Sequence, residues 1–428
     1  MQYQSTRDKT QKVSASRAIL QGLSAEGGLF VPEQLPKFSE QHLEKMVSQD
    51  YIRRAQKILE EFLSDFSNEE IESCLKGAYD AKKFSGSQIA PLSKLGENAY
   101  LLELWHGPTC AFKDMALQLL PRLMTVSMQK SGDGKEIVIL VATSGDTGKA
   151  ALEGFCNVPG IRIVVFYPEE GVSPLQKLQM ATQEGENVFV AAIQGNFDDA
   201  QSGVKKLFCD PQIATALQKQ NRVFSSANSI NWGRLLPQIV YYVSAYCDLV
   251  RDEQIALGDP INVCVPTGNF GNILAAYYAK QMGLPIHKLI CASNKNNVLT
   301  DFISTGTYDR NRPFYPTTSP SMDILISSNL ERLLFHLADE DDSIVRQLME
   351  DLKNEGRYTV PQQVLSRLQA DFAGGFSDEE ETAATIKRLF DTYSYLCDTH
   401  TAVAVSVHED YCARTGDDTK TVIASTAN

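Results

Sequence analysis

The stretch IVILVATSGDTGKA, residues 137–150, predicts the class of fold. Its first six residues, Ile137–Ala142, are apolar without alternation, which is typical of a strand that a parallel sheet buries on both faces. The small residues Thr143–Gly148 follow as a loop, and Thr147–Phe155 has the spacing of a helix. A strand, a short loop and a helix in this order form the repeating unit of α/β proteins.

The same alternation continues along the chain. Further strands are predicted at Ile161–Tyr167, Val188–Ile193, Ile261–Val265, Leu289–Ala292 and Thr421–Ala424. Further helices are predicted at Asp198–Phe208, Leu235–Val250 and Asn272–Met282. Because each strand is apolar on both faces, we expect an α/β protein with parallel sheets covered on both sides and right-handed crossovers.

Three other regions have a different character. Ser39–Ala81 is rich in Glu, Leu, Lys and Ile at helical spacing and predicts a helical N-terminal region. Asn294–Pro320 is rich in Asn, Thr and Pro and predicts a long ordered loop or lid, whereas residues 331–395 return to charged amphipathic helices.

A length of 428 residues exceeds what one hydrophobic core usually supports. We expect a mainly helical region at residues 1–95, a smaller α/β domain at 96–225 and a larger α/β domain at 226–428. These boundaries are approximate, and the domains are expected to interleave.

Composition excludes several classes of function. The net charge is −13, from 40 basic and 53 acidic residues, and no basic block offsets it, so a nucleic-acid partner is not expected. The nine cysteines include no C-x-x-C pair and the six histidines show no ligand spacing, which predicts no metal site. Met1–Lys12 lacks the apolar core of a signal peptide, and no 18 apolar residues run together. We therefore expect a cytoplasmic protein without a membrane partner.

A candidate nucleophile lies in WHGPTCAFKDM, residues 105–115. Lys113 precedes a helix-like run from Met115 through Leu123, and the positive end of a helix dipole should lower the pKa of its ammonium group. A neutral amine is the nucleophile that Schiff-base formation requires. From composition alone, an ordinary solvated lysine is the more common alternative.

Two loops have the composition of anion-binding sites. Thr143–Gly148 (TSGDTG) and Pro266–Asn272 (PTGNFGN) each join a predicted strand to a predicted helix, where backbone amides and the helix dipole attract phosphate or carboxylate. The alternatives are a capped strand-to-helix turn and a tight glycine turn. Neither loop matches the P-loop or the G-x-G-x-x-G fingerprint. A nucleophilic lysine near two anion sites indicates pyridoxal phosphate, which needs a lysine and carries its own phosphate.

HGPTCAFKD resembles the lysine motif of the threonine synthase family, which belongs to the fold type II pyridoxal-phosphate enzymes. ATSGDTGKAA, SSANSINWGRLLPQ, PTGNFGNILAA and IASTA resemble further segments of that family in the same order. The resemblance covers the chain from Tyr3 to Asn428. It implies two parallel-sheet α/β domains with a helical N-terminal region.

The resemblance also implies roles for individual residues. Lys113 would hold the cofactor, Asp146 would lie near its phenolic oxygen, and Thr426 would hydrogen-bond its pyridine nitrogen. The cofactor phosphate would bind Gly268, Asn269, Phe270, Gly271 and Asn272. The substrate carboxylate would bind Thr143, Ser144, Gly145 and Thr147, and the substrate phosphate would bind Asn228, Ser229 and Arg234.

The reaction implied is conversion of O-phospho-L-homoserine and water to L-threonine and phosphate, with Lys113 moving protons at the substrate carbons. A related phospholyase, a serine/threonine dehydratase and a catalytically silent binding module of the same fold are the alternatives. The long N-terminal region resembles forms that are often monomeric, so we expect a monomer that binds a small-molecule substrate.

Three further residues need comment. Cys110 stands where the family usually has a larger aliphatic residue, which we interpret as a packing variation. His106 either packs over the cofactor or caps the local turn, and the structural role is favoured. Relatives usually continue after the STA segment, so we expect the chain to be a truncated form that ends at Asn428.

Overall fold

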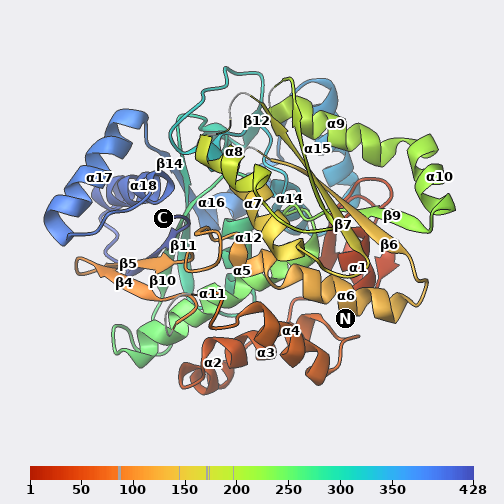
Figure 1. Cartoon of the computed structure of the whole chain (residues 1–428). Helices are drawn as coiled ribbons and strands as arrows, with labels where there is room; N and C mark the ends of the chain where they lie inside the picture. The colour runs from red at the N-terminus through yellow and green to blue at the C-terminus, as the bar shows by residue number, and fades with distance from the viewer. Residues whose placement is uncertain (85–87, 144, 170–171, 173, 196) are drawn as a thin grey trace.

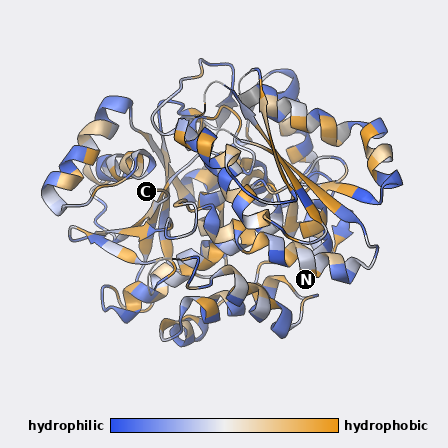
Figure 2. Ribbon diagram, in the orientation of Figure 1, coloured by the Kyte–Doolittle hydropathy of each residue, from blue (hydrophilic) through white to orange (hydrophobic). Residues whose placement is uncertain are grey.

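A computed structural model describes residues 1–84, 88–143, 145–169, 172, 174–195 and 197–428. Two sheets of mainly parallel strands lie side by side, and helices cover them (Figure 1). Hydrophobic residues concentrate on the central strands, and hydrophilic ones on the outer helix faces (Figure 2). This confirms the predicted α/β class with parallel sheets.

The larger sheet has the strand order β14-β11-β10-β15-β5-β4. Its strands are β4 (Leu92–Leu95), β5 (Ala99–Glu103), β10 (Ile261–Pro266), β11 (Ile286–Ser293), β14 (Phe372–Phe376) and β15 (Thr421–Ser425). All neighbours pair in parallel except β4 with β5. The strands predicted at Ile261–Val265, Leu289–Ala292 and Thr421–Ala424 are therefore confirmed.

Strand β14 was not predicted, because its sequence FAGGF contains two glycines that weaken any strand signal. The packing gives the reason for one of them. A Cβ added to Gly375 would lie 2.6 Å from the Val407 side chain on α18 (Thr399–Thr415). Helix α18 and its neighbour α17 (Glu379–Tyr393) cover one face of this sheet, and the glycine lets α18 approach it closely.

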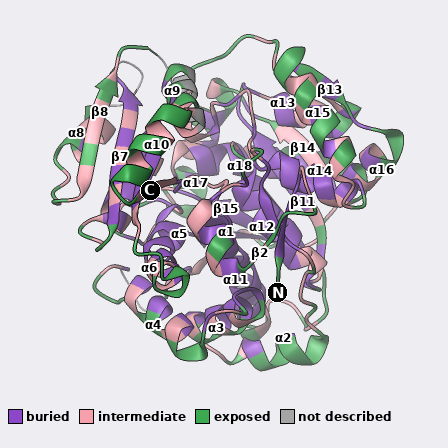
Figure 3. Cartoon of the chain, turned by 90° about the vertical axis from the view of Figure 1, so that its right-hand side faces the viewer, coloured by how far each residue is buried: buried purple, intermediate pink, exposed green. Residues whose placement is uncertain are grey.

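The smaller sheet has the order β8-β7-β6-β9 and is parallel throughout. Its strands are β6 (Glu136–Ala142), β7 (Ile161–Pro168), β8 (Val188–Ile193) and β9 (Arg222–Ser225). The connecting helices are α7 (Asp146–Phe155), α8 (Pro174–Ala181), α9 (Phe197–Cys209) and α10 (Pro211–Lys219). The expectation that every predicted strand is covered on both faces is wrong for β8. It is an edge strand, and Phe189 is 46% exposed (Figure 3).

The centre of the molecule is α11 (Trp232–Arg251), which is buried along nearly its whole length and packs against α12 (Gly271–Gln281) (Figure 3). The helical N-terminal region, with α2 (Glu40–Val47), α3 (Tyr51–Phe62) and α4 (Asn68–Ala78), is confirmed and packs below α11. Arg54 on α3 is fully buried and contacts Asp248 on α11 at 2.6 Å. This ion pair joins the two regions.

The extreme N-terminus forms a small sheet of β1 (Tyr3–Ser5), β2 (Lys12–Val13) and β3 (Phe30–Pro32). Helix α1 (Ala15–Gln21) lies between β2 and β3 in the chain. The predicted helices at 331–395 are confirmed as α14 (Leu330–Leu337), α15 (Asp342–Asn354), α16 (Gln362–Asp371) and α17. A short strand, β13 (Arg357–Thr359), and β14 interrupt them.

Two expectations about local structure are wrong in part. The run Met115–Leu123 is not one helix: α5 (Asp114–Leu117) ends before α6 (Leu120–Ser131) begins, with Pro121 in the first turn of α6. The predicted lid Asn294–Pro320 contains a helix, α13 (Val298–Thr305), and a strand, β12 (Thr307–Asp309). The buried Asn294 amide, which donates to Asp323 at 2.7 Å, fixes the remaining loop, because buried polar groups need such partners.

The strands at residues 92–103 belong to the larger sheet, since β5 pairs with β15. The expected boundary between residues 95 and 96 falls between two paired strands of this sheet, β4 and β5. The three-domain division stays a prediction. Within the described ranges, no helix is both long and apolar enough to cross a bilayer.

Candidate active site

Most of the predicted site residues line one cavity of about 700 Å³, whereas Gly145 is not among its lining residues. Its walls come from the segments that follow β6, β10 and β15, which is where an open parallel sheet usually binds ligands. The predicted residues that line it are Lys113, Thr143, Asp146, Thr147, Asn228, Ser229, Arg234, Gly268, Asn269, Phe270, Gly271, Asn272 and Thr426. Ser144 lies outside the described residues.

Lys113 is 7% exposed and reaches the cavity from the residue before α5. Its Nζ lies 3.2 Å from Asp146 Oδ2 and 3.3 Å from Ser321 Oγ, and 4.8 Å from the Phe112 ring centroid. Helix α5, which begins after Lys113, has only four residues, so a helix dipole contributes little there. The position of Lys113 depends on its contacts with Asp146 and Ser321, which are distant in sequence.

Asp146 is the first residue of α7 and the partner of Lys113. Burial by itself would raise the pKa of its carboxyl, but the Lys113 ammonium, His400 and the hydrogen bond from Ser321 Oγ (2.8 Å) hold that pKa well below its usual range. Gln176 on α8 donates to the other carboxylate oxygen. Asp146 is therefore a carboxylate at any physiological pH.

The Thr143 side chain forms hydrogen bonds within the Thr143–Gly148 loop. The Thr143 hydroxyl accepts from the N–H groups of Gly145 (3.0 Å) and Gly148 (2.9 Å) and donates to the Gly145 carbonyl. Gly145 has φ 149°, in the region that favours glycine, and α7 begins there without a side-chain cap. Thr147, in the first turn of α7, is only partly buried and faces the cavity.

The Gly268–Asn272 loop joins β10 to α12 and turns at Phe270, which has φ 62° and a ring packed on Phe372. The carbonyls of Gly268 and Asn269 accept from Ser327 Oγ (2.6 Å) and from Asn329 N (3.1 Å). Because N–H and C=O of a trans peptide point in opposite directions, the amides of Asn269 and Phe270 face away from these partners.

A close backbone contact requires a glycine at position 268, and the space at Gly271 is tight. A Cβ on Gly268 would lie 2.5 Å from the Ser321 carbonyl oxygen, and one on Gly271 would lie 3.2 Å from Ser229 Cβ. Asn272 Oδ1 accepts from the hydroxyls of Tyr241 and Tyr242, whereas its Nδ2 is buried without a partner among the described residues. That unpaired donor is available to an acceptor in the cavity.

Arg234 provides a second cationic group, on the first turn of α11. It is 4% exposed, its Nη1 donates to the Ala227 carbonyl at 2.6 Å, and its buried Nε has no partner in the part of the chain that the structure describes. Among the described residues no carboxylate pairs with it. Burial lowers the pKa of Arg234 to about 10, so the guanidinium stays charged at neutral pH. Asn228 lines the same cavity, and its buried Oδ1 is likewise unpaired within the described ranges.

The C-terminal segment closes the cavity beside Lys113. Thr426 is 5% exposed, and its carbonyl accepts from Phe112 N at 2.8 Å. Ala111 and Ala427 form an isolated antiparallel bridge. The lysine loop and the residues after β15 are therefore held together by backbone hydrogen bonds.

Sequence reasoning missed three side chains. Ser321 bridges Lys113 and Asp146, and its N–H donates to His400 Nε2 at 3.3 Å. His400 Nδ1 lies 2.8 Å from Asp398 Oδ1, and Gln176 contacts Asp146. None of them belongs to a motif, although the Asp398 cap of α18 is a local signal near His400.

His106, for which two roles were open, lies 2.8 Å from Glu103 and stacks on Trp105. It is not among the residues that line the cavity, in agreement with the structural role.

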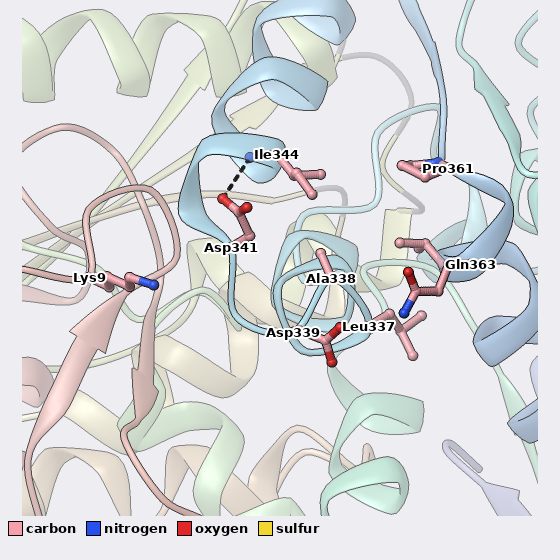
Figure 4. Close-up of a pocket in the computed structure, with 9 residues that line it drawn as sticks. Lys9, Leu337, Ala338, Asp339, Asp341, Ile344, Pro361 and Gln363 are labelled. Carbon is pink, nitrogen blue, oxygen red and sulfur yellow. Dashed lines mark hydrogen bonds between the residues drawn. The ribbon is translucent and has the colours of Figure 1, made fainter.

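A second hollow, of about 400 Å³, lies between Lys9, the turn after α14 and the start of α16 (Figure 4). Its acidic groups already have structural partners. Asp341 caps α15, and Asp339 pairs with Arg367 at 2.6 Å. This hollow contains none of the predicted site residues.

Comparisons with known proteins agree with the geometry. Residues 2–79 match the family described as "Threonine synthase N terminus", and residues 87–426 match "Pyridoxal-phosphate dependent enzyme". The chain is 39% identical to threonine synthase of Pseudomonas aeruginosa, over 95% of this chain and 83% of that protein. It superposes on the crystal structure of PLP-bound threonine synthase from Brucella melitensis with a TM-score of 0.91 and 39% identity, covering 100% of this chain and 89% of that one.

Another group of relatives is longer than this chain. The human protein "Threonine synthase-like 1" is 44% identical over 98% of this chain. The chain spans 53–58% of the length of this protein and its three mammalian counterparts.

The described side chains fit pyridoxal phosphate. A buried lysine is available for the aldehyde, and the Asn272 Nδ2 donor of the glycine loop has no partner among the described residues. Geometry, family matches and superposition agree: the chain belongs to the threonine synthase family of fold type II enzymes, whose cofactor is pyridoxal phosphate.

Proposed function

We propose that this protein converts O-phospho-L-homoserine and water to L-threonine and phosphate. The observation that supports this most directly is a second cationic group in the cavity of Lys113. Arg234 is buried, charged and without a carboxylate partner, and it lies apart in sequence from the glycine loop. A guanidinium with unpaired donors suits a phosphate, and a dehydratase substrate has none to offer it.

The cofactor would be held at both ends. The amides of Gly268–Asn272 would bind its phosphate, Thr426 would hydrogen-bond its ring nitrogen, and Asp146 would lie near its phenolic oxygen. When bound, pyridoxal phosphate supplies the electron-poor ring that takes up electron density from the substrate carbons. The Phe112 N–H donates to the Thr426 carbonyl, and this bond holds the Lys113 loop against the C-terminal segment.

Lys113 is the group we assign to proton transfer. Its Nζ has two polar neighbours, Asp146 Oδ2 and Ser321 Oγ, at 3.2 and 3.3 Å. A flexible amine between a carboxylate and a hydroxyl can exchange protons with a substrate carbon while its neighbours keep it in position. Elimination of the γ-phosphate and addition of water at Cβ both require such transfers.

The substrate would be oriented by its two anionic groups. The uncapped start of α7, with Thr147 and the Gly145 turn, would bind the carboxylate, and Ser144 and Thr143 of the same loop complete the predicted set. Asn228, Ser229 and Arg234 would bind the phosphate. Anchoring both ends fixes the bonds that break and form.

The test is a product analysis with wild type and Lys113→Ala. Wild type should release threonine and phosphate in equal amounts from O-phospho-L-homoserine, and Lys113→Ala should release neither. Borohydride should trap the cofactor on wild type only. Ketoacid and ammonia without threonine would instead assign a phospholyase, and a wild-type protein without a trappable cofactor would assign a silent binding module. Monomeric state and cytoplasmic location stay predictions.

A further inference from the structure

Asn329, at the start of α14, contacts both phosphate-binding segments of the site. Its Nδ2 donates to Ser229 Oγ at 2.9 Å and to the Asn269 carbonyl at 3.0 Å, and its backbone N–H donates to the same carbonyl at 3.1 Å. Asn329 is 0% exposed. One buried side chain therefore connects the segment before α11 with the loop before α12.

Arg332 fixes which way the Asn329 amide points. Its Nη1 lies 2.5 Å from Asn329 Oδ1, and its other groups donate to the carbonyls of Phe30 and Ile230. A guanidinium has no acceptor, so the atom facing it must be the amide oxygen. The Nδ2 group, with its two N–H donors, must then face Ser229 and Asn269.

This orientation determines the role of the Ser229 hydroxyl. A hydroxyl has one donor and two lone pairs, and Asn329 Nδ2 occupies one lone pair. Among the described residues Ser229 Oγ has no other hydrogen bond, and Ser229 lines the cavity. Its O–H is therefore available to donate to an acceptor in the cavity.

Arg332 adds a positive charge that no carboxylate among the described residues bonds. It is 0% exposed and bonds to carbonyl oxygens and Asn329, while the neighbouring Glu331 is engaged by Arg7 at 2.7 and 2.9 Å. A positive charge behind a hydrogen-bond chain polarises each member toward donating to an anion.

We propose that Asn329 is a positioning residue that presents the Ser229 hydroxyl as a donor to the substrate phosphate, with Arg332 fixing the orientation of Asn329. The inference rests on the proposed function, which places Ser229 at that phosphate. Asn329 does not touch the substrate in this arrangement and acts through Ser229.

The test is a double-mutant cycle on the cofactor-loaded protein, with inorganic phosphate as the probe and its dissociation constant measured by calorimetry. Ser229→Ala should weaken phosphate binding about tenfold to hundredfold, the usual worth of a hydrogen bond to a charged group. Asn329→Asp keeps the size of the side chain and its bond to Arg332, but its second carboxylate oxygen accepts the Ser229 proton. Adding Ser229→Ala to Asn329→Asp should then weaken binding less than about threefold further.

Two variants complete the experiment. Asn329→Ala serves as the second variant if the aspartate variant folds poorly, and it should also reduce the effect of Ser229→Ala. Ser327→Ala is the matched control, because Ser327 anchors the same loop through the Gly268 carbonyl at 2.6 Å and has no hydrogen bond to Ser229 among the described residues. In the Ser327→Ala background the full Ser229→Ala effect should remain.

The outcomes distinguish failure of the positioning role of Asn329 from failure of the proposed reaction. Fully additive losses from Ser229→Ala and Asn329→Asp would overturn the positioning role. A phosphate affinity unchanged by Ser229→Ala would overturn it as well, by removing Ser229 from the anion site. A protein that forms no threonine but shows the predicted coupling would refute the proposed reaction while the role of Asn329 stands.

Discussion

Replacing Gly268 with alanine tests how the glycine loop and Lys113, the proposed catalytic lysine, are connected. The added Cβ would lie 2.5 Å from the Ser321 carbonyl oxygen and 3.3 Å from Met322 Cα, whereas ordinary contact begins at 3.4 Å. The difference from 2.5 to 3.4 Å requires a displacement of about 0.9 Å, and both neighbouring atoms are backbone atoms, which yield less easily than a side chain. The turn that carries Ser321 must therefore move away from the loop.

That displacement reaches the chemistry through one side chain. Ser321 Oγ bonds both Lys113 Nζ (3.3 Å) and Asp146 Oδ2 (2.8 Å), so a shift of the turn changes the position of the amine. A misplacement of about 1 Å in an active site typically costs about a hundredfold in rate. We expect kcat/KM for threonine formation to fall by about that factor, with a loss of unfolding free energy of about 1–3 kcal/mol from overpacking.

The assay is steady-state threonine formation together with a urea unfolding curve. Gly203→Ala on α9 is the matched control, because a Cβ there meets nothing within 4 Å and no positive φ is required. It should leave the rate unchanged and stabilise the helix by about 0.5–1 kcal/mol. Activity of Gly268→Ala within about threefold of wild type would refute the argument that the Ser321 turn positions Lys113.

Two further predictions concern stability. Burial raises the pKa of Asp114 to about 6, against its hydrogen bonds from Thr109 (2.7 and 2.8 Å). The folded state therefore binds more protons than the unfolded state between pH 4 and pH 6, and this carboxyl lowers stability as pH rises through that window, by up to about 3 kcal/mol. In thermal scans, the stability of Asp114→Asn minus that of wild type should be larger at pH 7 than at pH 4.5. A stability difference that is the same at both pH values would contradict the raised pKa of Asp114. Arg54→Ala removes the 2.6 Å contact with Asp248, which keeps Arg251 at 2.7 Å, and it leaves the carbonyls of Met46, Val47 and Ser244 without their Arg54 donors. The loss should cost about 3 kcal/mol in urea unfolding and speed proteolysis of the N-terminal helices, and an unchanged unfolding midpoint would rule out Arg54 as the link to α11.

Local sequence was sufficient to predict two of the strand-and-loop segments that line the cavity. The uninterrupted apolar runs of β6 and β10 are confirmed because burial on both faces leaves a signal within six or seven adjacent residues. The two loops after them were predicted from their glycines, and Lys113 from the motif around it. For β8 the same apolar pattern was misleading, since an edge position depends on which strands pair, and no local pattern records that.

Only the tertiary structure decides how the site is assembled. Ser321 lies 208 residues from Lys113, and Asn329 lies 100 residues from Ser229, yet each pair is hydrogen-bonded. Serine and asparagine are common in loops for purely local reasons, so nothing in their sequence context predicts these contacts. The sequence predicted which residues carry the chemistry, and it determined the family to which the chain belongs. The fold determined how those residues are positioned, because side chains from separate segments meet only when the parallel strands bring their carboxyl ends together.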